Sequence, residues 1–182
     1  TAQNKAQLYQ IDIKNAYPTS DLKEDIYIEI PKGISLFPDH HPMKAALQHY
    51  TDPVFKLNKS LYGLKQAGKN WEEHLSKIVL ELGYKQNDAD PCLYEYNTSP
   101  DNKTTVTLPE AIGIYVDDIA ISAKTHEQYE NLCTHLDKQK LTVTKLGLAK
   151  LLLGVRIIQE KDYIRLTQDH FITEIAREYN LQ

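Results

Sequence analysis

The sequence predicts an α+β fold, in which one antiparallel sheet has helices packed on one of its faces. Several short segments alternate apolar and polar residues, which is typical of strands buried on one side only. Two longer segments, 71–82 and 129–136, carry apolar residues at helical spacing, with antiparallel strands expected between them. An apolar helix stripe needs a sheet to cover, so the two kinds of segment indicate a layer of helices on a sheet. The 182 residues suffice for one domain, or for one domain and a fragment of a second.

The composition is that of an ordinary globular protein, with 41% hydrophobic and 25% charged residues. A formal net charge of -4 argues against a surface that is basic throughout, but it allows a local basic patch. Cys92 and Cys133 lie far apart without metal-binding or redox spacing, so neither a disulfide framework nor a zinc ribbon is predicted, and a reducing intracellular compartment is expected. No apolar run approaches membrane-spanning length, and no membrane partner is expected.

The first two strands are expected at 8–13 and 26–30, where apolar and polar side chains alternate. In the first strand, Asp12 is displayed on the face opposite to the apolar residues. We expect Pro18 to stop this strand after a turn, and Pro31 to end the second strand.

The next segment, 31–53, is rich in proline and has no steady period, which predicts a long loop with one short helix around 43–49. It contains His40, His41 and His49. Their spacing matches no closed zinc site, so we expect them to belong to an exposed loop.

An amphipathic helix is expected over 71–82, where Gly83 follows as the C-terminal cap. Residues 92–96 are predicted to form a strand, and 97–105 a turn-rich connector. Two apolar runs within 112–122 then flank a pair of aspartates, as the strands of a hairpin flank its tip.

Thr125 and Gln128 form the Thr-x-x-Gln pattern of a capping box. They predict a helix that runs to about Lys140 and packs beside the first long helix. Two further strands are expected at 150–158 and 163–167. A last helix follows, with Thr167 as its cap and these side chains expected to be buried: Phe171, Ile172, Ile175 and Tyr179.

The hairpin IGIYVDDIAIS, 112–122, places Asp117 and Asp118 at an apolar tip. Neighbouring carboxylates there repel each other and are poorly solvated, so without a counter-charge their pKa values would rise. A divalent cation relieves both effects, and such oxygen-rich sites suit Mg²⁺. Asp12, near a strand end, is the best candidate for a third carboxylate, which would support a two-metal site. The alternative is an Asp-rich hairpin turn in which one side chain caps the other strand.

Three segments carry a family resemblance: YQIDIKNAYPTSDLKEDIYIEIPKG at 9–33, KLNKSLYGLKQAGKNW at 56–71 and IGIYVDDIAIS at 112–122. In this order they resemble the catalytic blocks of the reverse transcriptases of copia-type long-terminal-repeat retrotransposons. The resemblance continues through LGLAKLLLGVRI and YIRLTQDHFITEI, and covers nearly the whole chain. It implies a polymerase palm over 1–153 with partial fingers inserted at about 19–70. Primer-grip strands and the start of a thumb are implied over 154–182.

The family's catalytic, metal-binding carboxylates fall where Asp12, Asp117 and Asp118 stand. The implied cofactor is a pair of Mg²⁺ ions, for which Mn²⁺ can substitute. The backbone carbonyl of Ile13 is implied as a further metal ligand.

Three residues are implied to contact the incoming nucleotide: Tyr17, Gln66 and Tyr115. Such enzymes place an aromatic ring beneath the deoxyribose five residues after the first aspartate, where Tyr17 stands. A ring there collides with a 2′-hydroxyl and so favours dNTPs over rNTPs. The alternatives are that Tyr17 is one more packed tyrosine and that Gln66 is an exposed residue near a helix start.

A local basic patch lies at 53–71, which contains lysines and no acidic residue. Lys65 and Lys69 are expected to contact template or primer phosphates. Lys56 and Lys59 fit an ordinary solvated lysine face equally well.

Leu153 and Gly154 resemble the segment that holds the primer end, although by pattern alone LLLG is a buried strand with a glycine bend. The resemblance implies an RNA-directed DNA polymerase that uses an RNA or DNA template with a primer, and dNTPs. The remaining fingers, thumb, RNase H and integrase portions of a polyprotein are implied partners, in cytoplasmic virus-like particles with access to the nucleus.

Two departures from the family pattern qualify this expectation. Pro18 and Ser20 stand where the family commonly has another turn pair. The chain also begins shortly before Asp12, whereas family members carry triphosphate-binding basic side chains upstream, so we expect weak or no activity of this chain alone. The alternative function is a truncated or host-retained remnant that keeps the fold and nucleic-acid binding without polymerising.

Overall fold

The computed structural model describes residues 5–96 and 107–181, so the expected connector at 97–105 lies outside the described residues. The chain forms two compact units. The first combines Thr1–Ala16 with Glu72–Gln182, and the second is Tyr17–Trp71.

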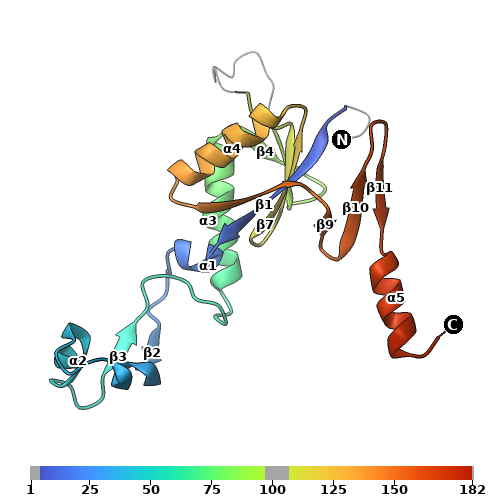
Figure 1. Ribbon diagram of the computed structural model, residues 1–182. Helices are drawn as coiled ribbons and strands as arrows, with labels where there is room; N and C mark the ends of the chain where they lie inside the picture. The colour runs from blue at the N-terminus through green and yellow to red at the C-terminus, as the bar shows by residue number, and fades with distance from the viewer. Residues whose placement is uncertain (1–4, 97–106, 182) are drawn as a thin grey trace. The chain divides into compact units, whose positions relative to one another are not determined.

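A six-stranded antiparallel sheet forms the centre of the first unit (Figure 1). Its strand order is β4-β5-β6-β7-β1-β8. The strands are β1 (Gln7–Lys14), β4 (Tyr84–Gln86), β5 (Leu93–Tyr96), β6 (Ala111–Tyr115), β7 (Asp118–Ala123) and β8 (Thr142–Leu148). The first strand of the chain therefore lies between the hairpin strand β7 and the later strand β8.

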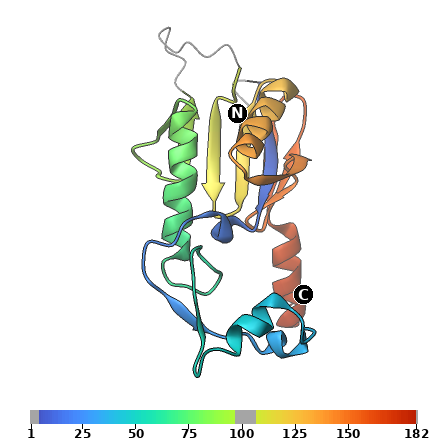
Figure 2. The ribbon, with the colours of Figure 1, turned by 90° about the vertical axis from the view of Figure 1, so that its left-hand side faces the viewer.

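Two helices, α3 (Ala67–Glu81) and α4 (His126–Lys138), cover the same face of this sheet (Figures 1 and 2). The predicted helical stripes are confirmed, because they supply most of the buried side chains of the two helices. Gly83 follows α3 with φ 95°, in the left-handed region that a glycine cap adopts readily. Thr125 and Gln128 form the predicted capping box at the start of α4. The α+β layer predicted from the sequence is thus present.

The pairing of the later strands differs from the prediction. β8 and β4 were not predicted at all. The expected strand at 150–158 is instead a hairpin of β9 (Leu151–Leu152) and β10 (Val155–Gln159), which forms a three-stranded sheet with β11 (Ile164–Thr167). The chain reverses at Leu153 and Gly154, with φ 49° and 77°, the positive values that a type I′ turn requires at both central positions.

The expected burial of the last helix is wrong. Helix α5 (Asp169–Glu178) has no buried residue. Its apolar side chains Phe171, Ile172 and Tyr179 are at least half exposed. The hydroxyl of Thr167 accepts the Asp169 N–H at 3.3 Å, although the capping position itself is taken by Gln168. Amphipathic spacing identified the helix, but it does not say whether a partner surface is present.

The second unit contains a two-stranded sheet of β2 (Tyr27–Glu29) and β3 (Val54–Lys56), with η2 (Lys32–Leu36) and α2 (Pro42–Leu47) between them. The second expected strand is therefore shorter than predicted. At the chain's passage into this unit, Pro18 does not stop β1, because the strand already ends at Lys14 and Pro18 lies inside α1 (Ala16–Thr19). Asn15, with φ 53°, makes the turn between the two elements.

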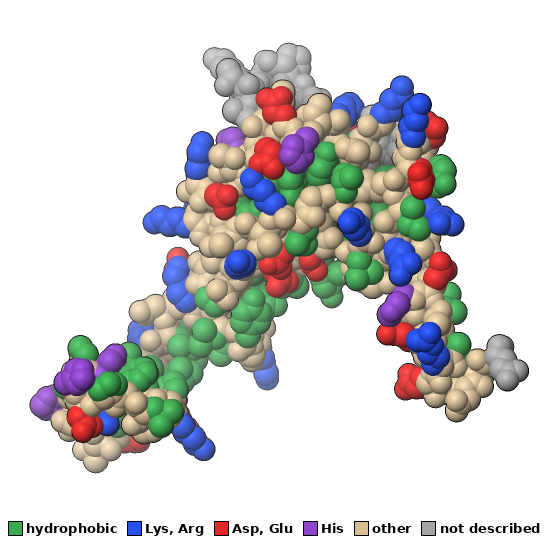
Figure 3. Space-filling model, in the orientation of Figure 1, with side chains coloured by type: hydrophobic (Ala, Val, Ile, Leu, Met, Phe, Trp, Pro, Cys, Tyr) green, Lys and Arg blue, Asp and Glu red, His purple; other side chains and the backbone are tan. Residues whose placement is uncertain are grey.

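Histidine side chains gather around α2 on the second unit (Figure 3). His41 is the N-cap of this helix, and its Nδ1 accepts the Met43 N–H at 3.3 Å. This contact gives His41 a structural role, in keeping with the expectation of an exposed loop.

Candidate functional site

The paired aspartates lie at a tight hairpin tip. Tyr115 at the end of β6 pairs with Asp118 at the start of β7, so only Val116 and Asp117 form the turn. Val116 has φ 56°, which is strained for a β-branched side chain. The tip is tied to β1, because the carbonyl of Asp117 accepts the Ile13 N–H at 2.9 Å.

The third carboxylate lies directly across from the hairpin. Asp12 on β1 is the register partner of Asp118 on β7, and cross-strand partners place their side chains on the same face of a sheet. Burial raises the pKa of the Asp12 carboxyl, the nearby Asp117 and Asp118 raise it further, and Lys14 opposes the shift. The structure therefore brings the three predicted carboxylates close enough to repel one another.

Gln10 is a site residue that the sequence reasoning missed. Its side chain is only 8% exposed, and its Nε2 donates to Asp118 Oδ1 at 3.1 Å. The signal was present in the sequence, because residues two apart in a strand share a face and Gln10 stands two before Asp12.

Thr144 is the second residue that was missed. It is the register partner of Asp12 on the other side, in β8. Its Oγ1 is buried and makes no hydrogen bond to any residue that the structure describes. Buried hydroxyls are normally paired, so an unpaired one beside a carboxylate fits a site that holds an ion or an ordered water. The sequence offered no route to Thr144 because β8 was not predicted.

The donor set fits the predicted magnesium chemistry. Carboxylate oxygens are the ligands that Mg²⁺ prefers, and a cation would offset both the burial and the repulsion that raise the Asp12 pKa. Within the described parts of the chain, no three His, Cys, Asp or Glu side chains are already arranged as a metal-holding group. The three carboxylates therefore lie near one another and have the right chemistry for Mg²⁺, but their side chains are not yet arranged around a common metal position.

Comparison with known proteins identifies the family. The profile described as reverse transcriptase (RNA-dependent DNA polymerase) matches residues 1–182. The chain belongs to the reverse transcriptase family. The resemblance to copia-type enzymes is also confirmed by similarity to retrotransposon polyproteins.

Two relatives are informative. The retrovirus-related Pol polyprotein from transposon TNT 1-94 of Nicotiana tabacum is 32% identical over 178 residues, which cover 97% of this chain and 12% of the polyprotein. The Ty1-DR5 Gag-Pol polyprotein of Saccharomyces cerevisiae is 27% identical over 186 aligned residues, covering 98% of this chain and 9% of the polyprotein. This reverse transcriptase chain therefore spans about a tenth of the length of these relatives.

The predicted nucleotide contacts Tyr17 and Gln66 of this reverse transcriptase lie in the second unit. The Tyr17 ring packs against Tyr62, with 4.5 Å between ring centroids. Gln66 is half-buried just before α3, and its carbonyl accepts the Asn70 N–H at 3.0 Å. The Tyr17 contact agrees with a packed tyrosine, and Gln66 lies at a helix start as its alternative has it, although it is half-buried and not exposed. The nucleotide roles of both residues stay predictions. Tyr115 belongs to the first unit and is 58% exposed next to the aspartates.

The four lysines of the basic patch differ in their partners. Lys56 forms an ion pair with Asp25 at 2.6 Å, and Lys59 forms one with Asp21 at 2.6 Å. Lys65 and Lys69 are exposed. The first two lysines are therefore partly neutralised by aspartates of the same unit.

Leu153 and Gly154 lie at the exposed tip of the β9–β10 hairpin, so the glycine bend expected from the pattern is confirmed and the buried strand is wrong. Gly154 also lines a pocket of about 590 Å³ with the basic side chains Lys150 and Arg156 and with His170 and Glu174, whose side chains lie 3.5 Å apart. Lys150 and Arg156 suit contact with a phosphate backbone.

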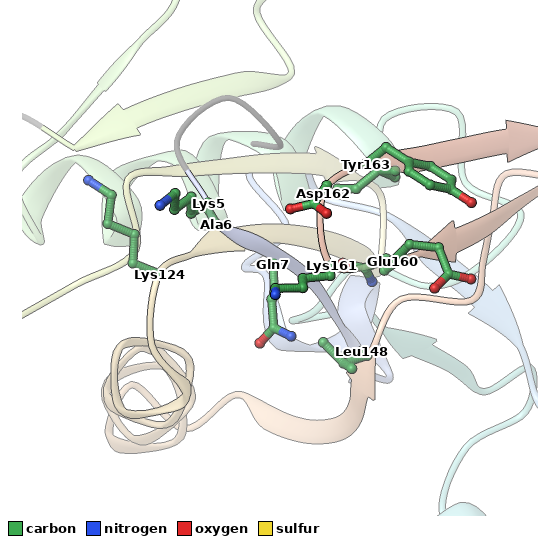
Figure 4. Close-up of a pocket in the computed structure, with 11 residues that line it drawn as sticks. Lys5, Ala6, Gln7, Lys124, Leu148, Glu160, Lys161, Asp162 and Tyr163 are labelled. Carbon is green, nitrogen blue, oxygen red and sulfur yellow. The ribbon is translucent and has the colours of Figure 1, made fainter.

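A second pocket of about 660 Å³ lies by the N-terminal end of β1, whereas Asp12 is near the C-terminal end of that strand (Figure 4). Its lining includes Lys5, Lys124 and Lys161 together with Glu160 and Asp162. None of the predicted site residues lines it.

Within 5–96 and 107–181, no helix is both long and apolar enough to cross a membrane.

Proposed function

We propose that this chain is the polymerising part of a retrotransposon Gag-Pol polyprotein, an RNA-directed DNA polymerase that adds dNMP units to a primer 3′-hydroxyl. The observation that carries the proposal is the meeting of Asp12, Asp117 and Asp118 at one end of the sheet, in a chain of the reverse transcriptase family. In the same proposal, 1–153 is a palm with partial fingers inserted at about 19–70, and 154–182 begins the thumb.

The three carboxylates would hold two Mg²⁺ ions, with the Ile13 carbonyl as an additional ligand. Bound Mg²⁺ supplies charge neutralisation at the phosphates and acidifies the primer hydroxyl. The chain's own contribution is to fix the carboxylates: β1 and β7 set Asp12 opposite Asp118, and the Ile13 N–H holds the Asp117 backbone. Strand ends held in this way orient reacting groups before the substrate arrives.

Substrate contacts are assigned to both units. Tyr115, exposed beside the aspartates, and Tyr17 with Gln66 would contact the dNTP. The Gly154 turn, with basic side chains nearby, would contact the primer strand. The relatives named above are polyproteins, so the other portions of such a polyprotein are the proposed partners.

A calorimetric titration with Mn²⁺ tests the metal assignment on this chain. The wild type should bind Mn²⁺, and Asp117→Asn combined with Asp118→Asn should bind it at least about tenfold more weakly, because two anionic ligands are lost. Asp88→Asn combined with Asp162→Asn is the matched control, since it removes the same charge at exposed positions. Equal Mn²⁺ affinity of the hairpin variant and the wild type would rule out Asp117 and Asp118 as metal ligands.

Primer extension tests the reaction itself. The polyprotein polymerase that contains this chain should extend a DNA primer on an RNA template, and the double asparagine variant should not. If a folded, metal-binding enzyme incorporates no dNTP, the non-polymerising alternative replaces the proposal.

A further inference from the structure

We propose that Gln10 is a positioning residue that fixes the carboxylate of Asp118 for metal binding, an inference that rests on the proposed function. The Gln10 side chain is 8% exposed and its Nε2 lies 3.1 Å from Asp118 Oδ1. Among the described residues, no other side chain donates a hydrogen bond to the three carboxylates. Asp118 is therefore the carboxylate whose rotation is restrained by a neighbour.

The chemistry of the contact determines which amide atom faces Asp118. An ionised carboxylate only accepts hydrogen bonds, so the glutamine must present its NH₂ group and not its carbonyl oxygen. The bond uses a lone pair on Oδ1 and leaves the lone pairs of Oδ2 available to a cation. A neutral donor also adds no charge that would compete with a cation. Partners of this kind orient metal ligands, and losing one typically lowers metal affinity about 10–100-fold.

Gln10 is itself held at an irregularity in the sheet. Between β1 and β8 the register moves from Gln10 opposite Gly147 to Ile11 opposite Lys145, so β8 carries a bulge. The hydroxyl of Tyr129 bridges this opening: it accepts the Gly147 N–H at 3.2 Å and donates to the Gln10 carbonyl at 3.5 Å. Tyr129 belongs to α4, so this helix sets the position of the bridging hydroxyl.

The Tyr129 ring is in turn fixed by packing. It is 1% exposed and stacks on Tyr9, with 4.6 Å between ring centroids and 20° between ring planes. A continuous series of contacts therefore runs from helix α4 through Tyr129 to the backbone of Gln10, and from the Gln10 amide to Asp118. The bulge places Gln10 where its amide reaches the carboxylate, and Tyr129 keeps it there.

Electron paramagnetic resonance titration of the 182-residue chain with Mn²⁺ tests the proposal. Gln10→Met keeps most of the side-chain volume and removes the donor, so the dissociation constant for Mn²⁺ should rise about tenfold. Gln10→Asn is a second variant, because it keeps a buried amide that is one methylene too short to reach Asp118. Tyr129→Phe should weaken Mn²⁺ binding in the same direction by a smaller factor. Gln139→Met, at the exposed C-terminal cap of α4, is the control and should bind as the wild type does.

Two further measurements on the same variants distinguish the proposed positioning role of Gln10 from a general role in the fold. The circular dichroism spectrum and the metal-free affinity for a primer–template duplex should be unchanged. Folded Gln10→Met and Gln10→Asn variants that bind Mn²⁺ as tightly as the wild type would overturn the proposal. A wild-type chain that binds no Mn²⁺ would instead count against the proposed function, so the two failures are distinguishable.

Discussion

In the folded protein, the ionised form of the Asp12 carboxyl is less stable relative to its protonated form than it is in water. Burial and the two hairpin aspartates raise its pKa above the ordinary value of 3.8. The metal-free protein should therefore gain stability when this charge is removed. We expect Asp12→Asn to raise the free energy of unfolding at pH 7 by up to about 1 kcal/mol, a small figure because the side chain is partly exposed and water screens the repulsion.

The sign of this effect gives it a pH signature. Above the raised pKa of the folded state, Asp12 is ionised in both states and the folded protein carries the full penalty. Below about 3.8, the ordinary value that applies to the unfolded chain, Asp12 is protonated in both states and the penalty vanishes. Urea unfolding at pH 7 and at pH 3 measures both limits, with Asp162→Asn as the exposed control. A gain that persists unchanged at pH 3 would show that it does not come from the charge.

At the same scale, the aspartates were predictable, whereas the contacts of their supporting residues were not. Two adjacent carboxylates in an apolar hairpin are visible in the sequence itself, and the strand pattern displays Asp12 with Gln10 on the same face. The contact of Gln10 with Asp118 and the place of Thr144 beside Asp12 follow only from the register of β1 with its two neighbours. Register between distant segments is set by the folded sheet, which a single strand's pattern does not encode.

Among the elements, the β6–β7 hairpin places a β-branched residue at a left-handed turn position. Its turn residue Val116 has φ 56°, in the region where a Cβ costs about 1–2 kcal/mol. We expect Val116→Gly to be more stable than Val116→Ala by about 1 kcal/mol, because glycine has no Cβ. Ile114, in the strand before the turn, is the control: there the alanine variant should be the more stable one. Chemical denaturation of the four variants measures both differences, and the same ranking at both positions would contradict the assignment of strain to Val116.

The elements that were predicted are those whose signals are local. Helices α3 and α4 follow from apolar spacing and caps, and the 112–122 hairpin from two apolar runs around a short polar tip. β8 was missed, although its Thr142, Val143 and Thr144 are β-branched, because its pairing partner β1 lies more than a hundred residues earlier in the chain. The burial expected for α5 failed for the same reason, since a helix's stripe does not reveal its partner.

For the molecule as a whole, chemistry divides between the two compact units. All three carboxylates belong to the first unit, with the Gly154 turn, whereas Tyr17, Gln66 and the basic patch belong to the second. The family profile nevertheless spans both units. Polymerase function as proposed therefore requires contributions from each, and the lysines of the second unit offer a measurement that does not depend on metal binding.

The salt dependence of nucleic-acid binding measures the contribution of these lysines. Each phosphate contact contributes about 0.9 to the slope of log affinity against log salt concentration on duplex DNA. We expect Lys65→Ala to weaken binding of a primer–template duplex and to lower this slope by about 1. Lys56→Ala changes the net charge by the same amount, but it removes a lysine that is already paired with Asp25. That control should lower the slope by less, because a paired ammonium gives phosphate a weaker attraction. Equal changes in the two variants would mean that net charge, and not contact by Lys65, determines the affinity.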